Sequence, residues 1–336
     1  MAWVVESARG GGIFLPQLGW HLDTRAGGGS SFVSHAHSDH LGRHRTTLCT
    51  APTARLMAAR LPGRRESLVL PFGDPWPLTS DARVTLFPAG HILGSAQWLV
   101  ENEHGRLLYT GDFKLQPGLS AERCATPRAD VLIMETTFGK PRYRFPAPER
   151  VADEMIAFCR EAIAEHAVPF LFCYSLGKSQ EVHARLADAG LPIMLHPLTA
   201  RMTAIYEEFD HRFPAYRLFE PRSAAGHVVI APPQVDGSPE LRTIRHRRSA
   251  MISGWALDPW TIPRHRYDAA FPLSDHADYD DLLRFVTAVG PRLVYTVHGF
   301  AAEFARDLRA RGIEAWALGR ENQLDLPLLN SSPSDR

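Results

Sequence analysis

Three histidines and one aspartate occupy six consecutive positions near the start of this 336-residue chain, in the run His35-Ala36-His37-Ser38-Asp39-His40. Imidazole and carboxylate groups at this density are typical of metal ligands. Side chains of an extended or turning segment diverge, so these four cannot all reach one ion at about 2.0–2.2 Å. The run therefore predicts two neighbouring metal ions. The alternative is a solvated histidine tract, and the strand-like residues 31–34 before the run argue against it.

Three more candidate ligands lie where the sequence predicts loops. His91 stands in a segment with glycines on both sides, which leaves room for an ion, while Asp112 and His298 each follow an apolar, strand-like run. A carboxylate has two oxygens, so Asp112 could bridge ions about 3.5–4 Å apart, as in two-metal hydrolases. A lone histidine at a strand end is more often structural, but together these residues complete a ligand set.

Composition restricts the partners. Lysine plus arginine and aspartate plus glutamate are balanced at 37 each, so a polyanion would have to be bound by local basic patches. The four cysteines are widely spaced and form no Cys-x-x-Cys pair, which argues against a disulfide framework and predicts a reduced, cytoplasmic protein. No apolar run approaches the roughly 20 residues of a membrane span, and we expect neither a leader nor a membrane partner.

The elements that must position these ligands change in type along the chain. Short apolar runs up to residue 100 predict strands, and two later runs, 106–110 and 130–134, each lead to a carboxylate, Asp112 and Glu135. Helical spacing then begins at residue 151 and alternates with a buried-type strand over 168–174. This alternation predicts an α/β module, and the candidate ligands lie on both sides of it in sequence.

The ligand residues resemble the motifs of the metallo-β-lactamase superfamily. Glu135 within residues 134–139, residues 175–181, and His276 within residues 271–278 further resemble motif A, the helix-opening loop and motif B of the β-CASP nucleases, with His298 as motif C. Residues 111–117, 137–143 and 253–256 are most similar to those of bacterial ligase-associated DNA exonucleases. The resemblance covers about residues 20 to 320.

This resemblance implies an α/β (α+β) fold, in which an αββα metallo-β-lactamase sandwich carries an inserted β-CASP α/β cap. The expected division places the sandwich at residues 1–145 and 271–325, the cap at 146–270 and a tail at 326–336. The substrate cleft is expected between the cap and the metal centre.

The resemblance also assigns the ligands. One ion is expected at His35, His37 and His91, the other at Asp39, His40 and His298, with Asp112 as the bridge. Three ligands plus a shared carboxylate leave each ion an open position for water. Nitrogen and oxygen ligands without thiolate suit two Zn²⁺ ions, and the carboxylates also admit Mn²⁺. Asp23 is expected to orient a ligand imidazole, the alternative being a structural aspartate in a turn.

The expected catalytic residues are Asp39, Glu135 and His276. A hydroxide held between two metals would attack the phosphodiester. His276 would protonate the leaving alkoxide, and Glu135 would orient His276 or favour its imidazolium form.

Lys114 follows Asp112 closely, and Lys140, Arg142 and Arg144 follow Glu135, so these residues are candidate substrate contacts. The resemblance adds Ser175, Gly177 and Lys178, because the corresponding loop of the family faces the cleft. Residues 177–179 resemble the end of a Walker A loop, but Phe172 replaces its first glycine, so we expect a phosphate at free backbone amides rather than a nucleoside triphosphate. The basic stretch Arg242, Arg245, His246, Arg247 and Arg248 could bind phosphate or form a solvated loop. Trp255 and Trp260 could stack on an unpaired base or be buried.

The expected function is metal-dependent hydrolysis of nucleic-acid phosphodiesters, as a DNA exonuclease in DNA repair. The choice of DNA comes from the resemblance alone, as does an association with an ATP-dependent DNA ligase and a helicase. The alternatives are an RNA nuclease of mRNA 3′-end processing or RNA maturation, a small-molecule metallo-hydrolase such as a lactonase or thioesterase, and a catalytically silent scaffold. Glu135, His276 and the cap disfavour the small-molecule hydrolase, and the full ligand set disfavours the scaffold.

Overall fold

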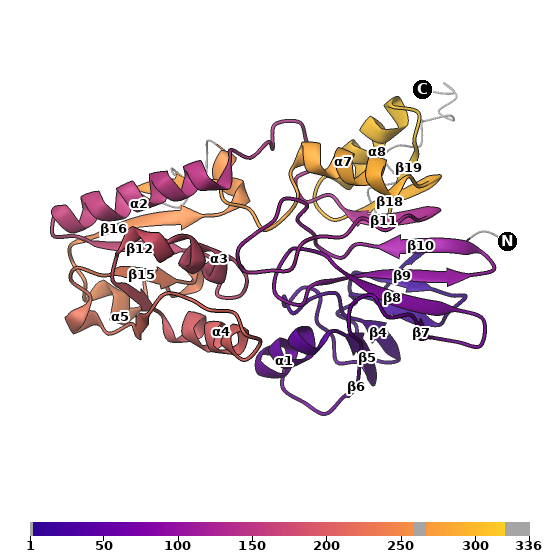
Figure 1. The fold of residues 1–336 in the computed structure, drawn as a ribbon, viewed down its shortest axis with the longest axis horizontal. Coiled ribbons are helices and arrows are strands. Elements are labelled where there is room, and N and C mark those ends of the chain that lie inside the picture. The colour runs from indigo at the N-terminus through magenta and orange to yellow at the C-terminus, as the bar shows by residue number, and fades with distance from the viewer. Residues whose placement is uncertain (1–2, 259–266, 320–336) are drawn as a thin grey trace, which may run out of the picture.

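The computed structural model describes residues 3–258 and 267–319, which form two lobes (Figure 1). The larger, called here the two-sheet lobe, contains two of the three sheets. Its first sheet has the order β1 (Glu6–Ser7), β2 (Ile13–Leu15), β3 (Trp20–Leu22), β4 (Ser30–Phe32), β5 (Thr46–Cys49) and β6 (Glu66–Val69). Its second has the order β19 (Glu314–Ala317), β18 (Leu293–Val297), β11 (Val131–Glu135), β10 (Gly105–Tyr109), β9 (Ala96–Asn102), β8 (Arg83–Pro88) and β7 (Trp76–Pro77).

These two sheets pack face to face. Phe32 of the first sheet and Trp98 of the second meet edge to face, with ring centroids 5.1 Å apart, inside a fully buried apolar cluster. The opposite face of the second sheet is covered by two helices, α7 (Tyr279–Val289) and α8 (Ala301–Ala310). Helix α1 (Ala51–Arg60) follows β5 and faces the other lobe.

Helix α7 shows why the sequence forms a helix at this position. The Asp278 side chain caps its first turn by accepting a hydrogen bond from the Asp281 amide, and Gly290 ends it in the left-handed conformation. Between these ends Leu282, Phe285, Val286 and Val289 recur at helical spacing, and all four are buried. The helix therefore buries one apolar stripe against the second sheet.

The second lobe, called here the one-sheet lobe, is an α/β layer structure. Its parallel sheet has the order β14 (Tyr216–Leu218), β13 (Ile193–Leu195), β15 (Val228–Ala231), β12 (Val168–Phe172), β16 (Arg247–Ile252) and β17 (Ala269–Phe271). Its helices are α2 (Pro148–Ala164), α3 (Lys178–Arg185), α4 (Pro197–Glu207) and the short α5 (Pro239–Arg242), with 3₁₀ turns at Ala187–Ala189, Pro221–Ser223, Pro233–Val235 and Gly254–Leu257. Every residue of β12 is buried, as expected for a central strand covered on both faces.

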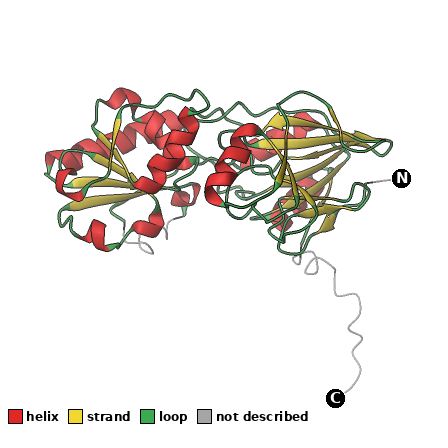
Figure 2. Ribbon diagram, turned by 90° about the horizontal axis from the view of Figure 1, so that it is seen from below, coloured by secondary structure: helices red, strands yellow, loops and turns green. Residues whose placement is uncertain are grey.

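Figure 2 shows the helices of the one-sheet lobe on both sides of its sheet. The architecture confirms the predicted fold class, a two-sheet sandwich with an inserted α/β layer structure. Strand β17 ends at Phe271, so the third sheet passes the expected boundary at 270 by one residue. The expected division into domains stays a prediction, and the tail at 326–336 lies outside the described residues. None of the described helices has the length and apolar character needed to cross a membrane.

Candidate metal centre

The candidate ligands come together because several strands end at one edge of the sandwich. The histidines of the opening run follow β4, Asp112 follows β10, Glu135 ends β11, and His298 follows β18. Strands β10, β11 and β18 are parallel neighbours, so their carboxyl ends meet at the same edge. His91 arrives from the loop between β8 and β9.

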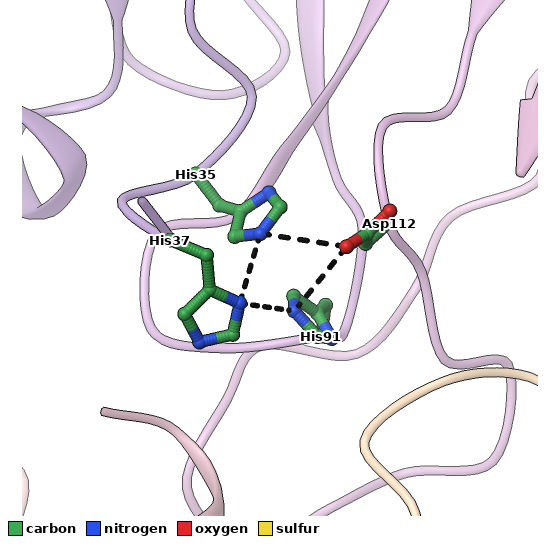
Figure 3. Close-up of side chains that lie close together, drawn as sticks. All are labelled: His35, His37, His91 and Asp112. Atoms are coloured by element: carbon green, nitrogen blue, oxygen red, sulfur yellow. Dashed lines mark hydrogen bonds and ion pairs between the residues drawn. The ribbon is translucent and has the colours of Figure 1, made fainter. Parts of the chain in front are cut away.

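The first group of ligands matches one expected ion site (Figure 3). His37 Nδ1 lies 3.0 Å from His35 Nε2 and 3.1 Å from His91 Nε2. Asp112 Oδ2 lies 3.6 Å from His35 Nε2 and 3.9 Å from His91 Nε2. A tetrahedral ion with bonds of about 2.1 Å holds its ligand atoms about 3.4 Å apart. The nitrogen and oxygen donors of this group therefore fit a Zn²⁺-type ion.

The protonation of these imidazoles also suits a metal. Burial, with a smaller contribution from the neighbouring His91, lowers the pKa of His37 to about 4. Burial likewise lowers the pKa of His35 and of His91 below the ordinary value. Neutral imidazoles keep the lone pair that binds a metal, and no proton has to be displaced.

A second group shares the Asp112 carboxylate. His40 Nε2 lies 3.3 Å from Asp112 Oδ2, and His298 offers a ring nitrogen to the same group. Asp39 is at the rim, with its Oδ2 3.6 Å from His40 Nε2 and its side chain 69% exposed. Among the described residues, the tightly gathered second group is therefore His40, Asp112 and His298, with Asp39 beside it rather than within it.

The backbone is strained at two residues of the site. Asp23 and His298 have φ of +51° and +60°, a conformation that residues other than glycine rarely adopt. Gly299 follows with φ +59°, and a Cβ there would lie 2.4 Å from the Cα of Thr137. This close approach to the loop after β11 explains the glycine. Strain of this kind clusters at functional sites.

Asp23 lies behind His40. Its Oδ2 is 3.0 Å from His40 Nδ1 and accepts a hydrogen bond from Tyr109 Oη at 2.8 Å, and its Oδ1 accepts one from the Ser34 amide at 2.7 Å. These bonds hold the His40 ring so that Nε2 faces Asp112. Sequence reasoning singled out Asp23 but missed Ser34 and Tyr109, which no spacing pattern marks.

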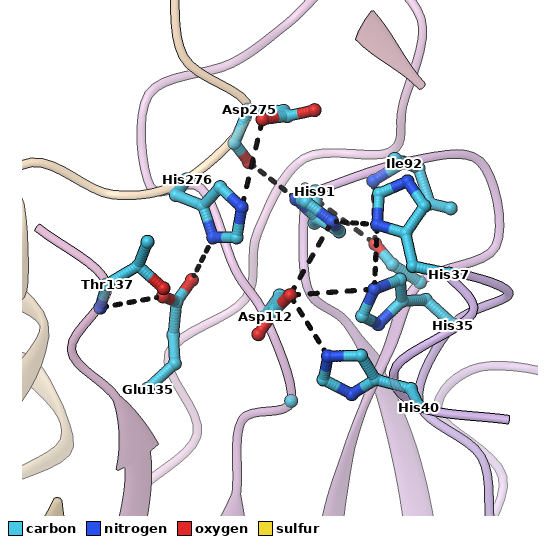
Figure 4. Close-up of polar contacts among 12 residues, drawn as sticks. His35, His37, His40, His91, Ile92, Asp112, Glu135, Thr137, Asp275 and His276 are labelled. Carbon is cyan, nitrogen blue, oxygen red and sulfur yellow. Dashed lines mark hydrogen bonds and ion pairs between the residues drawn. The ribbon is translucent and has the colours of Figure 1, made fainter. Parts of the chain in front are cut away.

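Glu135 and His276 form a pair beside the ligands (Figure 4). His276 Nδ1 lies 2.9 Å from Glu135 Oε1, and its ring centroid is 4.6 Å from that of His91. Glu135 is buried and accepts hydrogen bonds from the amides of Phe113 at 2.9 Å and Thr137 at 3.2 Å. Burial lowers the pKa of His276, but the hydrogen bond and charge of Glu135, together with the charges of Asp112 and Asp275, outweigh burial and raise the pKa to about 9. The imidazolium form is therefore favoured near neutral pH.

A cleft of about 520 Å³ opens over these residues and is lined by both lobes. From the two-sheet lobe it receives Asp112, His276 and His298, and from the one-sheet lobe Tyr174, Ser175 and Trp255. This arrangement could bind an extended substrate across the ligand groups.

Similarity to known proteins agrees with this geometry. Residues 269–318 match the family described as "Zn-dependent metallo-hydrolase RNA specificity domain". The chain is 57% identical over 337 residues to a "Probable DNA ligase" of Opitutus terrae, covering 100% of this chain and 33% of that protein. It is 26% identical over 286 residues to the "5' exonuclease Apollo" of Gallus gallus, covering 81% of this chain and 59% of that protein. The family model and these relatives support membership of the β-CASP branch of the metallo-β-lactamase superfamily.

A solved structure extends the fold comparison. The crystal structure of a protein of unknown function from Enterococcus faecalis matches with a TM-score of 0.59 and 14% identity, covering 87% of this chain and 79% of that one. At this identity the match supports the fold alone. The chain spans about a third and about three fifths of the two relatives named above.

The β-CASP loop that opens α3 is occupied by internal contacts. Lys178 is buried, and its Nζ donates to Asp275 Oδ1 at 2.7 Å and to the Leu273 carbonyl at 2.9 Å. The Gly177 amide donates to Gln180 Oε1 at 2.7 Å, and a Cβ on Gly177 would lie 2.2 Å from Ile92 Cγ2. Ser175 alone among the predicted contacts of this loop lines the cleft.

The basic residues after Glu135 also have partners within the protein. Lys140 Nζ lies 2.8 Å from Glu303 Oε1, Arg144 Nε donates to Asp280 Oδ2 at 2.8 Å, and Arg142 lies over the Tyr143 ring. Lys114 is also buried. Burial lowers its pKa, although the negative charge of Glu181 acts in the opposite direction. These four residues do not line the described cleft. A phosphate contact from any of them would require a change of partner.

The basic stretch 242–248 leads into β16 and includes its first two residues, whereas the cleft residue Trp255 follows the end of that strand. The basic stretch and the cleft are therefore at opposite ends of β16. Arg247 pairs with Asp236 at 2.9 Å, and Arg248 with Glu165 at 3.4 Å. These pairs agree with the alternative of a solvated basic surface. Trp255 is 39% exposed and lines the cleft, while Trp260 lies outside the described residues.

Proposed function

We propose that this protein is a metal-dependent nuclease that hydrolyses phosphodiester bonds of nucleic acid, with DNA as the substrate and exonucleolytic repair of DNA as the role. The observation that carries the proposal is the position of His276. It pairs with Glu135 at 2.9 Å, and Glu135 and His276 together with Asp112 form a further close group of side chains. A proton donor thus stands beside ligands for a metal within one cleft.

Two ions, Zn²⁺ or alternatively Mn²⁺, would be held by His35, His37 and His91 on one side and by His40, His298 and Asp39 on the other, with Asp112 shared. Bound metal would activate the attacking water and offset charge on the phosphate. Of the two carboxylates, Asp39 is the more exposed, with 69% of its side chain exposed, and its Oδ2 lies 3.6 Å from His40 Nε2. An exposed side chain has room to turn, so we expect Asp39 to complete the second group when an ion binds.

The protein residues supply proton transfer and orientation. His276 has Nδ1 on Glu135, so its Nε2 is the atom that would donate a proton to the leaving oxygen. Glu135 is fixed by two backbone amides and holds the imidazolium in place. Asp23 keeps His40 directed at Asp112. Cleavage of a strong bond to an alkoxide leaving group needs this proton.

The choice of DNA is supported by the names of the relatives. One is named a 5′ exonuclease, and another a probable DNA ligase in which the matching region makes up 33% of the length. This region is thus found in a ligase-named protein, which supports a partnership with an ATP-dependent DNA ligase. A helicase partner rests on the sequence resemblance alone, and a cytoplasmic location rests on the spacing of the four cysteines. The description of the family that matches residues 269–318 favours RNA as the second candidate substrate.

The deciding experiment uses end-labelled single-stranded DNA, duplex DNA and RNA of the same sequence, incubated with the protein and Zn²⁺ or Mn²⁺. Release of mononucleotides from DNA alone is the expected result. Cleavage of RNA alone would show that the substrate is RNA and not DNA. No cleavage of any substrate by metal-loaded protein would contradict a nuclease, and hydrolysis of a lactone or thioester in the same preparation would support the small-molecule alternative.

A further inference from the structure

A second pocket adjoins the metal cleft where the two lobes meet. It has a volume of about 320 Å³ and lies between the end of α1 and the start of α4, two helices that face each other across the lobes (Figure 1). Ser38, Arg60, Ser175 and Gln234 line both this pocket and the metal cleft. The two spaces are therefore neighbours, and one extended ligand could occupy both.

Arg60 stands at this junction with an unsatisfied donor. It is the last residue of α1, and its Nε is buried without a hydrogen-bond partner among the described residues. Arg55, on the same helix, instead forms a pair with Glu208 of the one-sheet lobe at 2.7 Å. A buried guanidinium nitrogen without a partner is unfavourable unless a ligand satisfies it.

Arg201 approaches from the other lobe. It lies on α4, and its Nη2 donates to the Ala59 carbonyl at 2.8 Å, which brings it next to the residue before Arg60. The rest of the lining includes apolar side chains, among them Met202 and the 42% exposed Leu198. Two guanidinium groups beside an apolar surface match a phosphate joined to a planar base.

We propose that this pocket holds the nucleotide adjacent to the one at the metal centre, with its phosphate on Arg60 and Arg201 and its base against Leu198 and Met202. The inference rests on the proposed nuclease function and adds a subsite to it. Guanidinium groups bind phosphate oxygens through paired N–H donors. An apolar surface can contact any of the bases, so the subsite would bind a strand without preference for its sequence.

The test compares a long and a short substrate in the metal-loaded protein. A single-stranded oligonucleotide spans both spaces, whereas bis(p-nitrophenyl) phosphate contains one diester and reaches only the metal cleft. In Arg60→Gln and in Arg201→Gln, the ratio of kcat/KM for the oligonucleotide to that for the small diester should fall about tenfold or more. Loss of one phosphate contact should also make the dependence of log(kcat/KM) on log salt shallower by about 0.7.

Two further variants control the result. Arg60→Lys keeps the charge and should recover part of the ratio, and Arg212→Gln, which replaces an exposed arginine that lines neither pocket, should behave as the wild type. If the ratio is unchanged in Arg60→Gln and Arg201→Gln, the subsite proposal is wrong. This includes the case in which kcat/KM falls equally for both substrates.

A binding measurement separates this inference from the proposed function. Fluorescence anisotropy with a labelled oligonucleotide should show Arg60→Gln binding about tenfold more weakly than Arg212→Gln at the same salt concentration. If the wild type hydrolyses neither substrate, the nuclease proposal fails and this difference still decides the subsite. Equal affinities of the two variants would overturn it.

Discussion

Lys178 and Asp275 form a buried ion pair, 2.7 Å long, that connects the one-sheet lobe to the residue immediately before His276. The backbone carbonyl of Asp275 in turn lies 2.7 Å from His91 Nδ1. Burial raises the pKa of Asp275, but the charges of Lys178 and of the nearby histidines together outweigh burial and leave the pKa below its ordinary value. The one-sheet lobe therefore helps to position both a candidate proton donor and a candidate ligand.

Lys178→Met should destabilise the fold strongly. It would leave the buried Asp275 carboxylate without its lysine partner, with only the more distant His276 Nε2, at 3.9 Å, among the described residues. Breaking a buried pair in this way lowers the free energy of unfolding by about 3–5 kcal/mol. Urea unfolding of the metal-loaded protein measures the change. The matched control is Arg150→Met, which breaks the exposed Arg150–Glu154 pair and should change stability by less than about 1 kcal/mol. Similar effects of both substitutions would contradict the positioning role.

His276→Ala should reduce turnover of an oligonucleotide by about 10²–10⁴-fold, the usual contribution of a general acid. Metal content should stay at the wild-type level, because the ring is not assigned to either ligand group. The loss should be much smaller for bis(p-nitrophenyl) phosphate, since p-nitrophenolate leaves without being protonated. Loss of bound metal in this variant would make His276 a ligand, and equal losses on both substrates would exclude the proton-donor role.

Asp23→Asn should weaken metal binding. Asparagine keeps one acceptor oxygen but replaces the other by an NH₂ group, so it cannot make all the hydrogen bonds of Asp23 to Ser34, His40 and Tyr109. His40 then loses its fixed orientation, and such changes typically reduce metal affinity about 10–100-fold. A competition titration with a chromophoric chelator measures the affinity. Tyr109→Phe removes only one of the hydrogen bonds to Asp23 and should have a smaller effect. Unchanged affinity in Asp23→Asn would reduce Asp23 to a structural turn residue.

His183 should make the stability of the protein depend on pH. It is fully buried beside the Phe213 ring, and burial lowers its pKa to about 4 from the ordinary 6.5. Between these values the unfolded chain binds the proton and the folded chain does not, so stability falls as the pH falls from about 6.5 to about 4. The slope contributed by one such group is at most about 1.4 kcal/mol per pH unit.

Urea unfolding at a series of pH values tests this expectation. His183→Leu should lose the His183 part of the slope between pH 6.5 and pH 4, while His246→Gln, at an exposed histidine, should keep it. An unchanged slope in His183→Leu would assign the pH dependence to other groups.

Much of the metal centre could be predicted because its signals are local. His35, His37 and His40 are close in sequence, and their residue types alone predict that they are metal ligands. The strand and helix periods around Asp112 and Glu135 likewise depend on neighbouring residues, so the sequence determined the fold class and the alternation of the α/β lobe.

The partners of individual charges were decided only by the tertiary structure. Lys178 was expected at a phosphate, but it is buried against Asp275, which lies 97 residues away in the sequence. Tyr109 reaches Asp23 across 86 residues. Arg60 Nε has no hydrogen-bond partner within residues 3–258 and 267–319, and this depends on which helix faces the end of α1. The sequence by itself determined which groups could bind a metal, because ligand chemistry belongs to residue types. Which charges remain free for a substrate depends on long-range packing, and only the folded chain decided that.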